Sequence, residues 1–460
     1  MVSSFKFSVS SNPLETVNSK LEALSRIVTY PEAIQHLLEL NLFGTKLGLD
    51  NPRRLATTAG SPHERLRFIH VAGTNGKGSV CAMLESIYRE AGLRTGLFTS
   101  PHLVSFRERI QVNRELIPEE TVASLAAQLR DFAAKFHKDQ SPTFFEVVVV
   151  MALCHFAEQA CDIVLWETGM GGRLDATNIV TPLAGVITNI GLDHTRWLGK
   201  THAAIAAEKA GIIKPRIPVL TTAGQPEGLA VIRAEAAKHS AQLIELGQTE
   251  EIAELPLNGR HQQTNASLAR AVVERLQAEL PVAPGVIRNG LAKVHWPGRL
   301  QAVRHGEQTV MLDGAHNAEG AEMLRRALAE RFAAESPVFI LGMVDEKDGA
   351  GVCAELAPLA TRGVLSPVSS VRSAKPEGFL AVCQAANPAA SVEVAESLGQ
   401  AMELCATEPF VVVTGSFYLV GEAMERLGVA PAPVGTERLL NDWNAPERGA
   451  QTGGARPVSD

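Results

Sequence analysis

The chain has 460 residues, of which 45% are hydrophobic and 20% are charged, a composition typical of a globular protein long enough to form two cores. Its formal net charge of −7 argues against nucleic acid or an anionic membrane surface as a partner, because both attract basic proteins. No run reaches the ~18 apolar residues of a membrane span, and residues 1–14 contain no apolar signal segment. We therefore expect a cytoplasmic protein without membrane or nucleic-acid partners.

The six cysteines are scattered along the chain, without the close pairs of a zinc site. Even Cys154 and Cys161, seven residues apart, fall between an expected helix and an expected strand. We therefore expect reduced thiols and no structural metal held by cysteine.

The first half of the chain alternates helix and strand patterns. Residues 16–40 have helical spacing, with Pro31 beginning a second helix, and a loop follows over residues 44–52. Expected strands are Arg67 to Ala72, Arg94 to Thr99, Asp162 to Glu167, Ala184 to Asn189 and Pro218 to Thr222. Strands separated by helices at this spacing predict a mostly parallel sheet covered on both faces.

The stretch from Val71 to Ser79 has the pattern of a phosphate-binding loop. A short apolar strand precedes its glycines, and Ser79 to Ala91 has helical spacing. Unpaired N–H groups at a helix N-terminus favour an anion, and Lys77 adds a positive charge for the β- and γ-phosphates. Because Gly78 follows the lysine, the metal-binding hydroxyl of the common motif must come from Ser79. The alternative is a glycine-rich turn without a ligand.

Polar segments fall at the carboxyl ends of four expected strands, where parallel sheets bind ligands. They are Gly73 to Ser79, Ser100 to His102, Glu167 to Asn178 and Asn189 to His194. Three of these side chains, Ser100, Glu167 and His194, offer a hydroxyl, a carboxylate and an imidazole that can surround Mg²⁺ beside bound phosphates. Taken singly, each has a structural alternative: a helix cap, an ion pair with Arg173, and an ordinary polar residue.

Trp296 to Arg299 breaks the pattern with proline and glycine, and a second strand series follows. Its expected strands are Thr309 to Asp313, Val338 to Leu341, Gly363 to Ser366 and Phe410 to Gly415, with a helix over Ala318 to Phe332. The fold class is therefore α/β, with an N-terminal P-loop ATPase domain over residues 1–297 and a smaller Rossmann-like domain over 298–430. Residues 431–460 have no periodic apolar face and are predicted to form a flexible tail.

As a set and in order, the motifs resemble the folylpolyglutamate synthase and dihydrofolate synthase family, which belongs with the Mur ligases. The resemblance runs from about residue 40 to about residue 425. It is carried by Ala72 to Ser79, Thr99 to Leu103, Phe144 to Glu146, Glu167 to Asn178, Asp193 to Thr195, Glu208 to Lys214, Pro297 to Arg299 and Leu312 to Asn317. One departure is Val371 to Ala374, where the family often has a proline-arginine-alanine turn, so the contribution of Arg372 is left open.

The resemblance implies roles for single residues. Those matching Asn75, Gly76, Lys77, Gly78, Ser79, Asn265, Arg299 and Asp313 bind ATP, and those matching Ser100, Glu167, His194 and Lys209 bind Mg²⁺. The lysine matching Lys209 is carbamylated, which turns an ammonium into an anionic oxygen ligand. Its alternative is a solvated lysine beside Glu208. His316 is expected to face the incoming amino acid, and the alternative is a structural turn in which the neighbouring Asn317 caps a helix. Lys77, Lys209 and His316 form the implied catalytic set.

The pterin-bearing substrate is implied to lie against three segments, comprising Gly48, Leu49, Asp50 and Asn51, then Pro142, Thr143, Phe144 and Phe145, then Leu174, Asp175 and Ala176. Phe144 and Phe145 offer aromatic faces for a flat ring, although such residues are as often part of a core. Asp175 can accept hydrogen bonds from ring donors.

The implied activity is an ATP-dependent amide ligase that adds L-glutamate to dihydropteroate, to folates or to both, through an acyl phosphate. The expected cofactors are ATP and Mg²⁺, the partners are these small substrates, and the enzyme is expected to be a monomer. Two alternatives are a Mur-type ligase acting on a cell-wall precursor and a nucleotide-binding regulator that forms no bond. Phe144 to Glu146 and Glu167 to Asn178 favour the folate branch. The sequence leaves open which acceptor is preferred.

Overall fold

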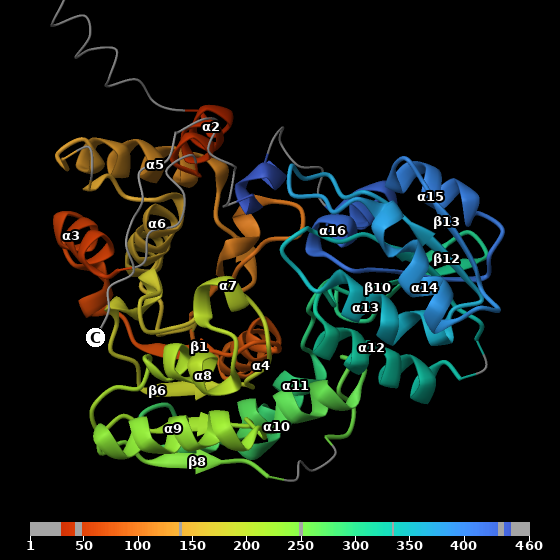
Figure 1. The fold of residues 1–460 in the computed structure, drawn as a ribbon. Helices are drawn as coiled ribbons and strands as arrows, with labels where there is room; N and C mark the ends of the chain where they lie inside the picture. Colours follow the sequence, from red (N-terminus) through yellow and green to blue (C-terminus); the bar gives the residue numbers. More distant parts are fainter. Residues whose placement is uncertain are drawn as a thin grey trace, which may run out of the picture.

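The computed structural model describes residues 29–41, 48–137, 140–247, 252–333, 335–430 and 437–442. These residues form two α/β parts side by side, each built on its own sheet (Figure 1). The helix predicted from residue 16 is described only over its second section, α2 (Tyr30–Asn41). The first section and residues 44–47 of the predicted loop lie outside the described residues. The end of that loop is wrong, because α3 (Asp50–Thr58) begins at Asp50.

The N-terminal part contains sheet A, with the strand order β4-β3-β2-β5-β1-β6-β7-β8. Its strands are β1 (Phe68–Ala72), β2 (Thr95–Phe98), β3 (Ile110–Val112), β4 (Glu115–Leu116), β5 (Ile163–Glu167), β6 (Ala184–Ile187), β7 (Val219–Thr221) and β8 (Leu243–Glu245). From β2 to β8 the neighbours are parallel, whereas β3 and β4 extend one edge as antiparallel strands. The predicted mostly parallel sheet is therefore confirmed.

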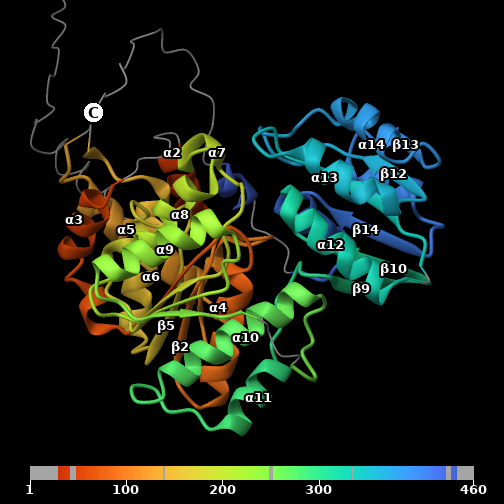
Figure 2. The same ribbon diagram turned by 60° about the horizontal axis from the view of Figure 1, so that its bottom comes forward.

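Both faces of sheet A are buried under helices. Successive side chains of each strand point to opposite sides, so β1, for example, contributes to two separate cores. Phe68 packs in one core with residues of α2, α3, α5 and α6, while Ile69 and Val71 pack in another with residues of α4, α10 and α11. Helices α8 and α9 cover the β6–β7 end, and Figure 2 shows helices on both sides of the strands. These helices are α3 (Asp50–Thr58), α4 (Lys77–Glu90), α5 (Glu119–Ala133), α6 (Phe144–Glu158), α8 (His202–Ala210), α9 (Pro226–Lys238), α10 (Arg260–Arg275) and α11 (Pro284–Ala292).

The C-terminal part contains sheet B, with the order β13-β12-β11-β14-β10-β9. Its strands are β9 (Gln301–His305), β10 (Gln308–Leu312), β11 (Val338–Leu341), β12 (Arg362–Leu365), β13 (Ser391–Val394) and β14 (Phe410–Thr414), and only β9 is antiparallel to its neighbour. One face packs on α15 (Leu398–Leu404) and α16 (Phe417–Arg426), the other on α12 (Ala318–Arg331), α13 (Gly349–Leu356) and α14 (Leu380–Ala386). This second α/β unit also agrees with the predicted fold class.

The boundary predicted at residues 297 and 298 stays a prediction, although sheet A ends at Glu245 and sheet B begins at Gln301. The flexible tail is wrong for residues 437–442. They include a short 3₁₀ helix, η7 (Glu437–Asn441), in which Glu437, Leu440 and Asn441 are buried. A single turn is too short to show an apolar period, so the sequence pattern could not reveal it. The rest of the predicted tail lies outside the described residues.

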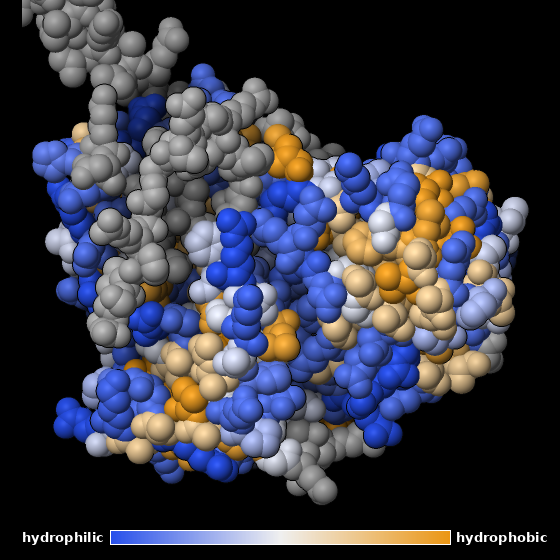
Figure 3. Space-filling model, in the orientation of Figure 1, coloured by the Kyte–Doolittle hydropathy of each residue, from blue (hydrophilic) through white to orange (hydrophobic). Residues whose placement is uncertain are grey.

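All six cysteines have free thiols, as expected. Within the described ranges, no helix combines the length and the hydrophobicity needed to cross a membrane. Figure 3 shows hydrophilic residues over much of one face, with a hydrophobic cluster over the C-terminal part.

Leu165 provides a test of the sheet A core. It lies in β5 with no exposed surface, between β2 and β1. We expect Leu165→Ala to lower the free energy of unfolding by about 2–5 kcal/mol, because the truncation leaves a cavity in a packed interior. The urea midpoint measured by circular dichroism gives the change. Leu192→Ala, at a side chain that is 52% exposed, is the control and should change stability by less than about 0.5 kcal/mol.

Candidate active site

Four polar segments meet at one edge of sheet A, as predicted. They follow β1, β2, β5 and β6, which are adjacent and parallel in the order β2-β5-β1-β6. Parallel neighbours end on the same side, so residues distant in sequence face one another there. Side chains from these four ends line one cavity of about 150 Å³, called the phosphate-loop cavity below.

The loop after β1 requires glycine at two positions. Gly76 is the N-cap of α4 with φ of 82°, and a Cβ there would lie 2.6 Å from Asn265 Oδ1. Gly73 has φ of 153°, and a Cβ there would lie 1.8 Å from Thr188 Oγ1. Left-handed backbone and close neighbours together exclude larger residues. The helix begins at Lys77, two residues earlier than predicted, so its free N–H groups belong to the loop itself.

Two lysines converge on the same carbonyl of this loop. Lys77 Nζ donates to the oxygens of Gly73 and Thr74 at 3.1 and 3.2 Å, and Lys209 Nζ donates to that of Gly73 at 2.8 Å. Lys209 lies in the last turn of α8 and is buried, so the alternative of a solvated lysine is wrong. Burial, reinforced by the charge of Lys77, lowers the pKa of Lys209 to about 7. The loop therefore concentrates positive charge that an anion would stabilise.

Glu167 is a buried carboxylate at the end of β5. Its Oε2 accepts a hydrogen bond from Ser100 N at 3.2 Å, and burial raises its pKa to about 7 against the opposing charge of Lys77. The structural alternatives for these two residues are wrong. Arg173 pairs with Glu208 at 2.7 Å instead, and Ser100 caps no helix, because the next helical turn begins at Phe106.

His194 lies in a polar cluster that joins the two parts of the protein. Lys347, from the C-terminal part, places Nζ 2.6 Å from Asp193 Oδ1 and 3.3 Å from His194 Nε2. Burial and the charge of Lys347 lower the pKa of His194 to about 3, so its imidazole is neutral. Burial, the largest single effect, would raise the pKa of Asp193, but Lys347 together with His316 and His194 holds that pKa well below its usual range. Sequence reasoning missed Lys347, which stands in no motif.

The C-terminal part supplies another wall of the phosphate-loop cavity. The Arg299 guanidinium lies 4.8 Å from the centre of the Phe417 ring. Asp313 accepts hydrogen bonds from the backbone N–H groups of Leu300 and Ala315, both at 2.9 Å. His316 Nδ1 lies 2.8 Å from Gly314 O, and its Nε2 is 3.6 Å from Asp193 Oδ2. Asn317 caps α12 through Gly320 N, as its alternative reading expected.

All residues predicted to bind ATP or metal line this single cavity. They are Asn75, Gly76, Lys77, Gly78, Ser79, Ser100, Glu167, His194, Lys209, Asn265, Arg299 and Asp313, together with His316. Their placement brings the candidate set together, and their individual roles stay predictions.

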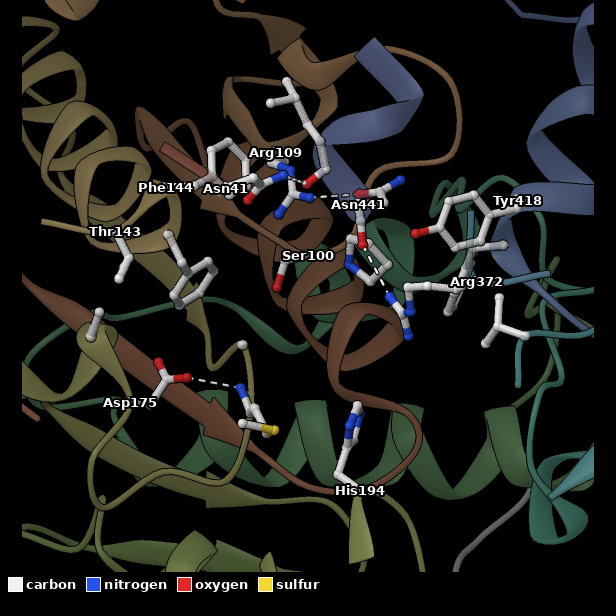
Figure 4. A pocket seen from close by; sticks show the side chains of 18 of the residues that line it. Asn41, Ser100, Arg109, Thr143, Phe144, Asp175, His194, Arg372, Tyr418 and Asn441 are labelled. Carbon is white, nitrogen blue, oxygen red and sulfur yellow. Dashed lines mark hydrogen bonds between the residues drawn. The ribbon is translucent and has the colours of Figure 1, made fainter. Parts of the chain in front are cut away.

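A second, larger cavity of about 210 Å³ adjoins the first and is called the aromatic cavity. Six of the predicted substrate residues line it, namely Thr143, Phe144, Phe145, Leu174, Asp175 and Ala176. It shares Ser100, His194 and His316 with the phosphate-loop cavity. Three cationic side chains, those of Arg109, Lys347 and Arg372, also line it. In Figure 4, Arg109 lies beside Phe144 and Arg372 lies on the side of Tyr418.

The lining of the aromatic cavity is built by local capping. Thr143 caps α6, accepting a hydrogen bond from Glu146 N at 3.4 Å, and Thr143 N donates to Glu146 Oε2 at 2.7 Å. This capping box aims Phe144 and Phe145 from the first turn of the helix. Phe144 is also part of the core, in contact with Phe106. Asp175 already accepts from Met170 N and from Thr177 N, so much of its hydrogen-bonding capacity shapes the loop.

Five predicted substrate residues do not line either cavity. They are Gly48, Leu49, Asp50, Asn51 and Pro142. Gly48 N donates to Leu174 O at 3.4 Å, and Asn51 Nδ2 to Glu146 Oε2 at 3.5 Å. The segment over residues 48–51 thus supports residues that face the cavity.

The phosphate-loop cavity contains donors of the kinds that Mg²⁺ accepts. Within the described residues, no group of three or more His, Cys, Asp and Glu side chains is placed to hold a metal. Ser100, Glu167 and His194 nevertheless offer a hydroxyl, a carboxylate and a neutral imidazole in one cavity, and such donors suit Mg²⁺ when phosphate oxygens complete the shell. Lys209 as an ammonium opposes a cation there, and as a carbamate it fits one.

The sequence matches two family models, "Mur ligase middle domain" over residues 71–251 and "Dihydrofolate synthetase, C-terminal domain" over residues 298–426. A dihydrofolate synthase/folylpolyglutamate synthase of Bacillus subtilis is 35% identical over 413 residues, which cover 84% of this chain and 96% of that protein. The Escherichia coli protein of the same description is 33% identical, over 85% and 94% of the two chains. The chain belongs to the folylpolyglutamate synthase and dihydrofolate synthase family.

Solved structures of this family have the same fold. A Mycobacterium tuberculosis folylpolyglutamate synthase complexed with ADP and AMPPCP has a TM-score of 0.79 and 31% identity, and the match covers 87% of this chain and all of that one. The Escherichia coli FolC complex with DHPP and ADP has a TM-score of 0.77 and 32% identity, over 88% and 98% of the chains. The predicted resemblance and fold are confirmed, and this family member is an ATP-dependent ligase.

Gly76 provides a test of the loop. We expect Gly76→Ala to weaken the binding of a non-hydrolysable ATP analogue by about tenfold, roughly 1.4 kcal/mol, because the added Cβ displaces Asn265. Isothermal titration calorimetry measures the affinity. The matched control is Gly60→Ala, which has the same left-handed backbone (φ of 83°) but no atom within 4 Å of the new Cβ. It should carry a similar backbone strain and bind the analogue as the wild type does.

Proposed function

We propose that the enzyme uses ATP to join the amino group of L-glutamate to the carboxylate of dihydropteroate or of a folate. The observation that carries this proposal is the junction of the two cavities at Ser100, His194 and His316. A flat ring held among the aromatic residues can direct its carboxylate through this junction to a phosphate on the glycine loop. The same junction suits both acceptors, so we propose a bifunctional enzyme.

In the first step, an oxygen of the acceptor carboxylate attacks the γ-phosphorus of ATP, and ADP leaves. The product is an acyl phosphate, in which the carbonyl carbon carries a good leaving group. Lys77 is at the first turn of α4, where its charge and the free N–H groups of the loop stabilise the transferring phosphoryl group. Arg299 enters the cavity from the C-terminal part and adds a positive charge that Lys77 cannot supply alone.

Mg²⁺, held by Ser100, Glu167 and His194 with the phosphates, would neutralise charge on the phosphoryl oxygens. We further propose that Lys209 carries a carbamate. Its lowered pKa of about 7 leaves much of the amine neutral near neutral pH, and a neutral amine adds to CO₂ with release of one proton. The resulting anion would replace a buried cation beside Lys77 by an opposite charge, which relieves the repulsion between the two lysines.

In the second step, the nitrogen of glutamate attacks the acyl carbon, the bond to the phosphate oxygen breaks, and the amine loses a proton. Lys347 and Arg372 line the aromatic cavity from the C-terminal part and can hold carboxylates of the amino acid. His316 lies where both cavities meet, with burial lowering its pKa. A neutral imidazole at this place can accept the proton of the attacking amine.

Assembly of the site from two parts of the protein also keeps water away from the acyl phosphate. Asp193, Lys347 and His316 form their contacts across the boundary of the two parts and are mostly buried. Exclusion of water matters because hydrolysis of the intermediate would consume ATP without forming a bond. Proximity of the two substrates then supplies much of the remaining rate gain.

Lys77→Ala tests the proposed function together with a product assay. The wild type should form ADP and a glutamylated product only when glutamate and a pteroyl acceptor are both present. The variant should fold normally and lose at least about a hundredfold in kcat, because it lacks a charge on the transferring group. Product analysis by mass spectrometry, with dihydropteroate and with a monoglutamyl folate, decides between acceptors. ATP turnover without an acceptor would indicate a nucleotide-binding regulator, and turnover only with a cell-wall precursor would indicate a Mur-type ligase.

Lys209→Ala tests the carbamate. We expect activity to be nearly lost and partly restored by a short carboxylic acid that occupies the vacated oxygen position. Lys214→Ala is the control, because its Nζ bonds Asn178 O away from both cavities, and its activity should change little. The carbamate itself should be visible as electron density on Lys209 in a crystal of the nucleotide complex. A plain ammonium in an active, nucleotide-bound crystal would contradict this proposal.

A further inference from the structure

We propose that residues 437–442 form part of the substrate site, with Asn441 positioning Arg109 and Arg372 at the wall of the aromatic cavity. This inference rests on the proposed function for the identity of the ligand, a pteroyl carboxylate. Leu440 and Asn441 line the cavity, although they follow the C-terminal α/β unit in the sequence. In Figure 1 the dark blue turn of η7 lies beside α2, close to the boundary between the two parts.

The segment is fixed to the N-terminal part by polar contacts at buried positions. The Glu437 carboxylate accepts hydrogen bonds from Phe106 N at 2.6 Å and Ser105 Oγ at 2.9 Å. Asn41 Nδ2 lies 3.4 Å from the carbonyl oxygens of Leu439 and Leu440. These hydrogen bonds involve backbone groups and a buried carboxylate. They therefore fix the backbone of residues 437–440 in one position against the N-terminal part.

The same six residues are also fixed to the C-terminal part. Asp442 Oδ1 accepts hydrogen bonds from Tyr418 Oη at 2.7 Å and Ser370 Oγ at 2.5 Å. Arg438 forms an ion pair with Glu425 of α16. The segment therefore bridges the two parts, with its buried face towards the cavity.

Asn441 lies between the two arginines, as Figure 4 shows. Its Oδ1 accepts from Arg109 Nη2 at 2.6 Å, and its backbone oxygen accepts from Arg372 Nη1 at 3.3 Å. Its Nδ2 donates to His102 O at 3.0 Å, which fixes the orientation of the amide. One residue thus holds a guanidinium from each part of the protein.

Arg109 depends on these neighbours because it is buried. Its Nε donates to His102 Nδ1 at 2.9 Å, which places the His102 proton on Nε2, where it is donated to Glu437 O at 3.1 Å. Burial lowers the pKa of Arg109 to about 10, which leaves it charged at neutral pH. A buried cation held by neutral acceptors is well suited to bind a carboxylate. Asn441 would then act on the pteroyl substrate through Arg109, and it is a positioning residue. Arg372 differs, because it is already paired with Glu346 at 3.0 Å.

The test compares Asn441→Ala with the wild type in the full-length chain. We expect the KM for the pteroyl acceptor to rise by about tenfold, because a charged hydrogen bond that orients Arg109 is lost. The KM for ATP should stay unchanged, since Asn441 does not line the phosphate-loop cavity. Asn441→Asp keeps an acceptor for Arg109, but it adds a negative charge beside the guanidinium and loses the bond to His102 O, so it should also weaken binding of the pteroyl carboxylate. Leu439→Ala is the matched control on the same turn, with a 39% exposed side chain, and should leave every constant unchanged.

Equilibrium binding of the pteroyl compound, measured by fluorescence titration, separates this inference from the proposed function. If the wild type binds the compound but forms no glutamylated product, the proposed function is wrong, and weaker binding by Asn441→Ala still supports the positioning role. If Asn441→Ala lowers the thermal midpoint but binds and turns over the pteroyl compound as the wild type does, the segment only stabilises the fold and the inference is overturned. Failure of the wild type to bind the compound overturns both.

Discussion

The position of β1 between β5 and β6 is the constraint on which the site depends. Parallel pairing on both sides of β1 places the phosphate loop next to Glu167 on one side and the Asp193–His194 turn on the other. The neighbouring strand β2 then adds Ser100. No single loop supplies all of these groups, because they come from four different strand ends. The chemistry of the site is therefore a consequence of strand order.

Charged groups of both signs are buried together in the site. Lys77, Lys209 and Lys347 are gathered around two carboxylates, Glu167 and Asp193. The raised pKa of Glu167 and the lowered pKa of Lys209 have the same cause, the removal of water from a charged group, so burial disfavours the charged form of both. Phosphate oxygens would restore the lost solvation for the lysines, and a cation would do so for Glu167.

The sequence predicted what depends on local patterns. The strand alternation, the glycine loop and the polar strand ends were all visible, because each leaves a periodic or motif signal. Lys347 and Asn441 could not be predicted in this way, because their partners are distant in the sequence. Lys347 binds Asp193, 154 positions away, and Asn441 binds Arg109, 332 positions away. Short edge strands such as β4 and β13 were also missed, because two to four residues give too few alternations. Residues 48–51 support the cavity lining from behind, a distinction that needs three dimensions.

Contacts between the two parts of the protein fall on the phosphate loop itself. Glu319, at the start of α12, accepts hydrogen bonds from Asn75 Nδ2 and Asn189 Nδ2, both at 2.9 Å. Gly191 permits this approach, because a Cβ there would lie 2.2 Å from Glu319 Oε2. A nucleotide bound to the loop therefore lies next to the surface on which the C-terminal part docks. The loop and the part that supplies Arg299 and His316 are therefore joined by direct hydrogen bonds through Asn75, Asn189 and Glu319.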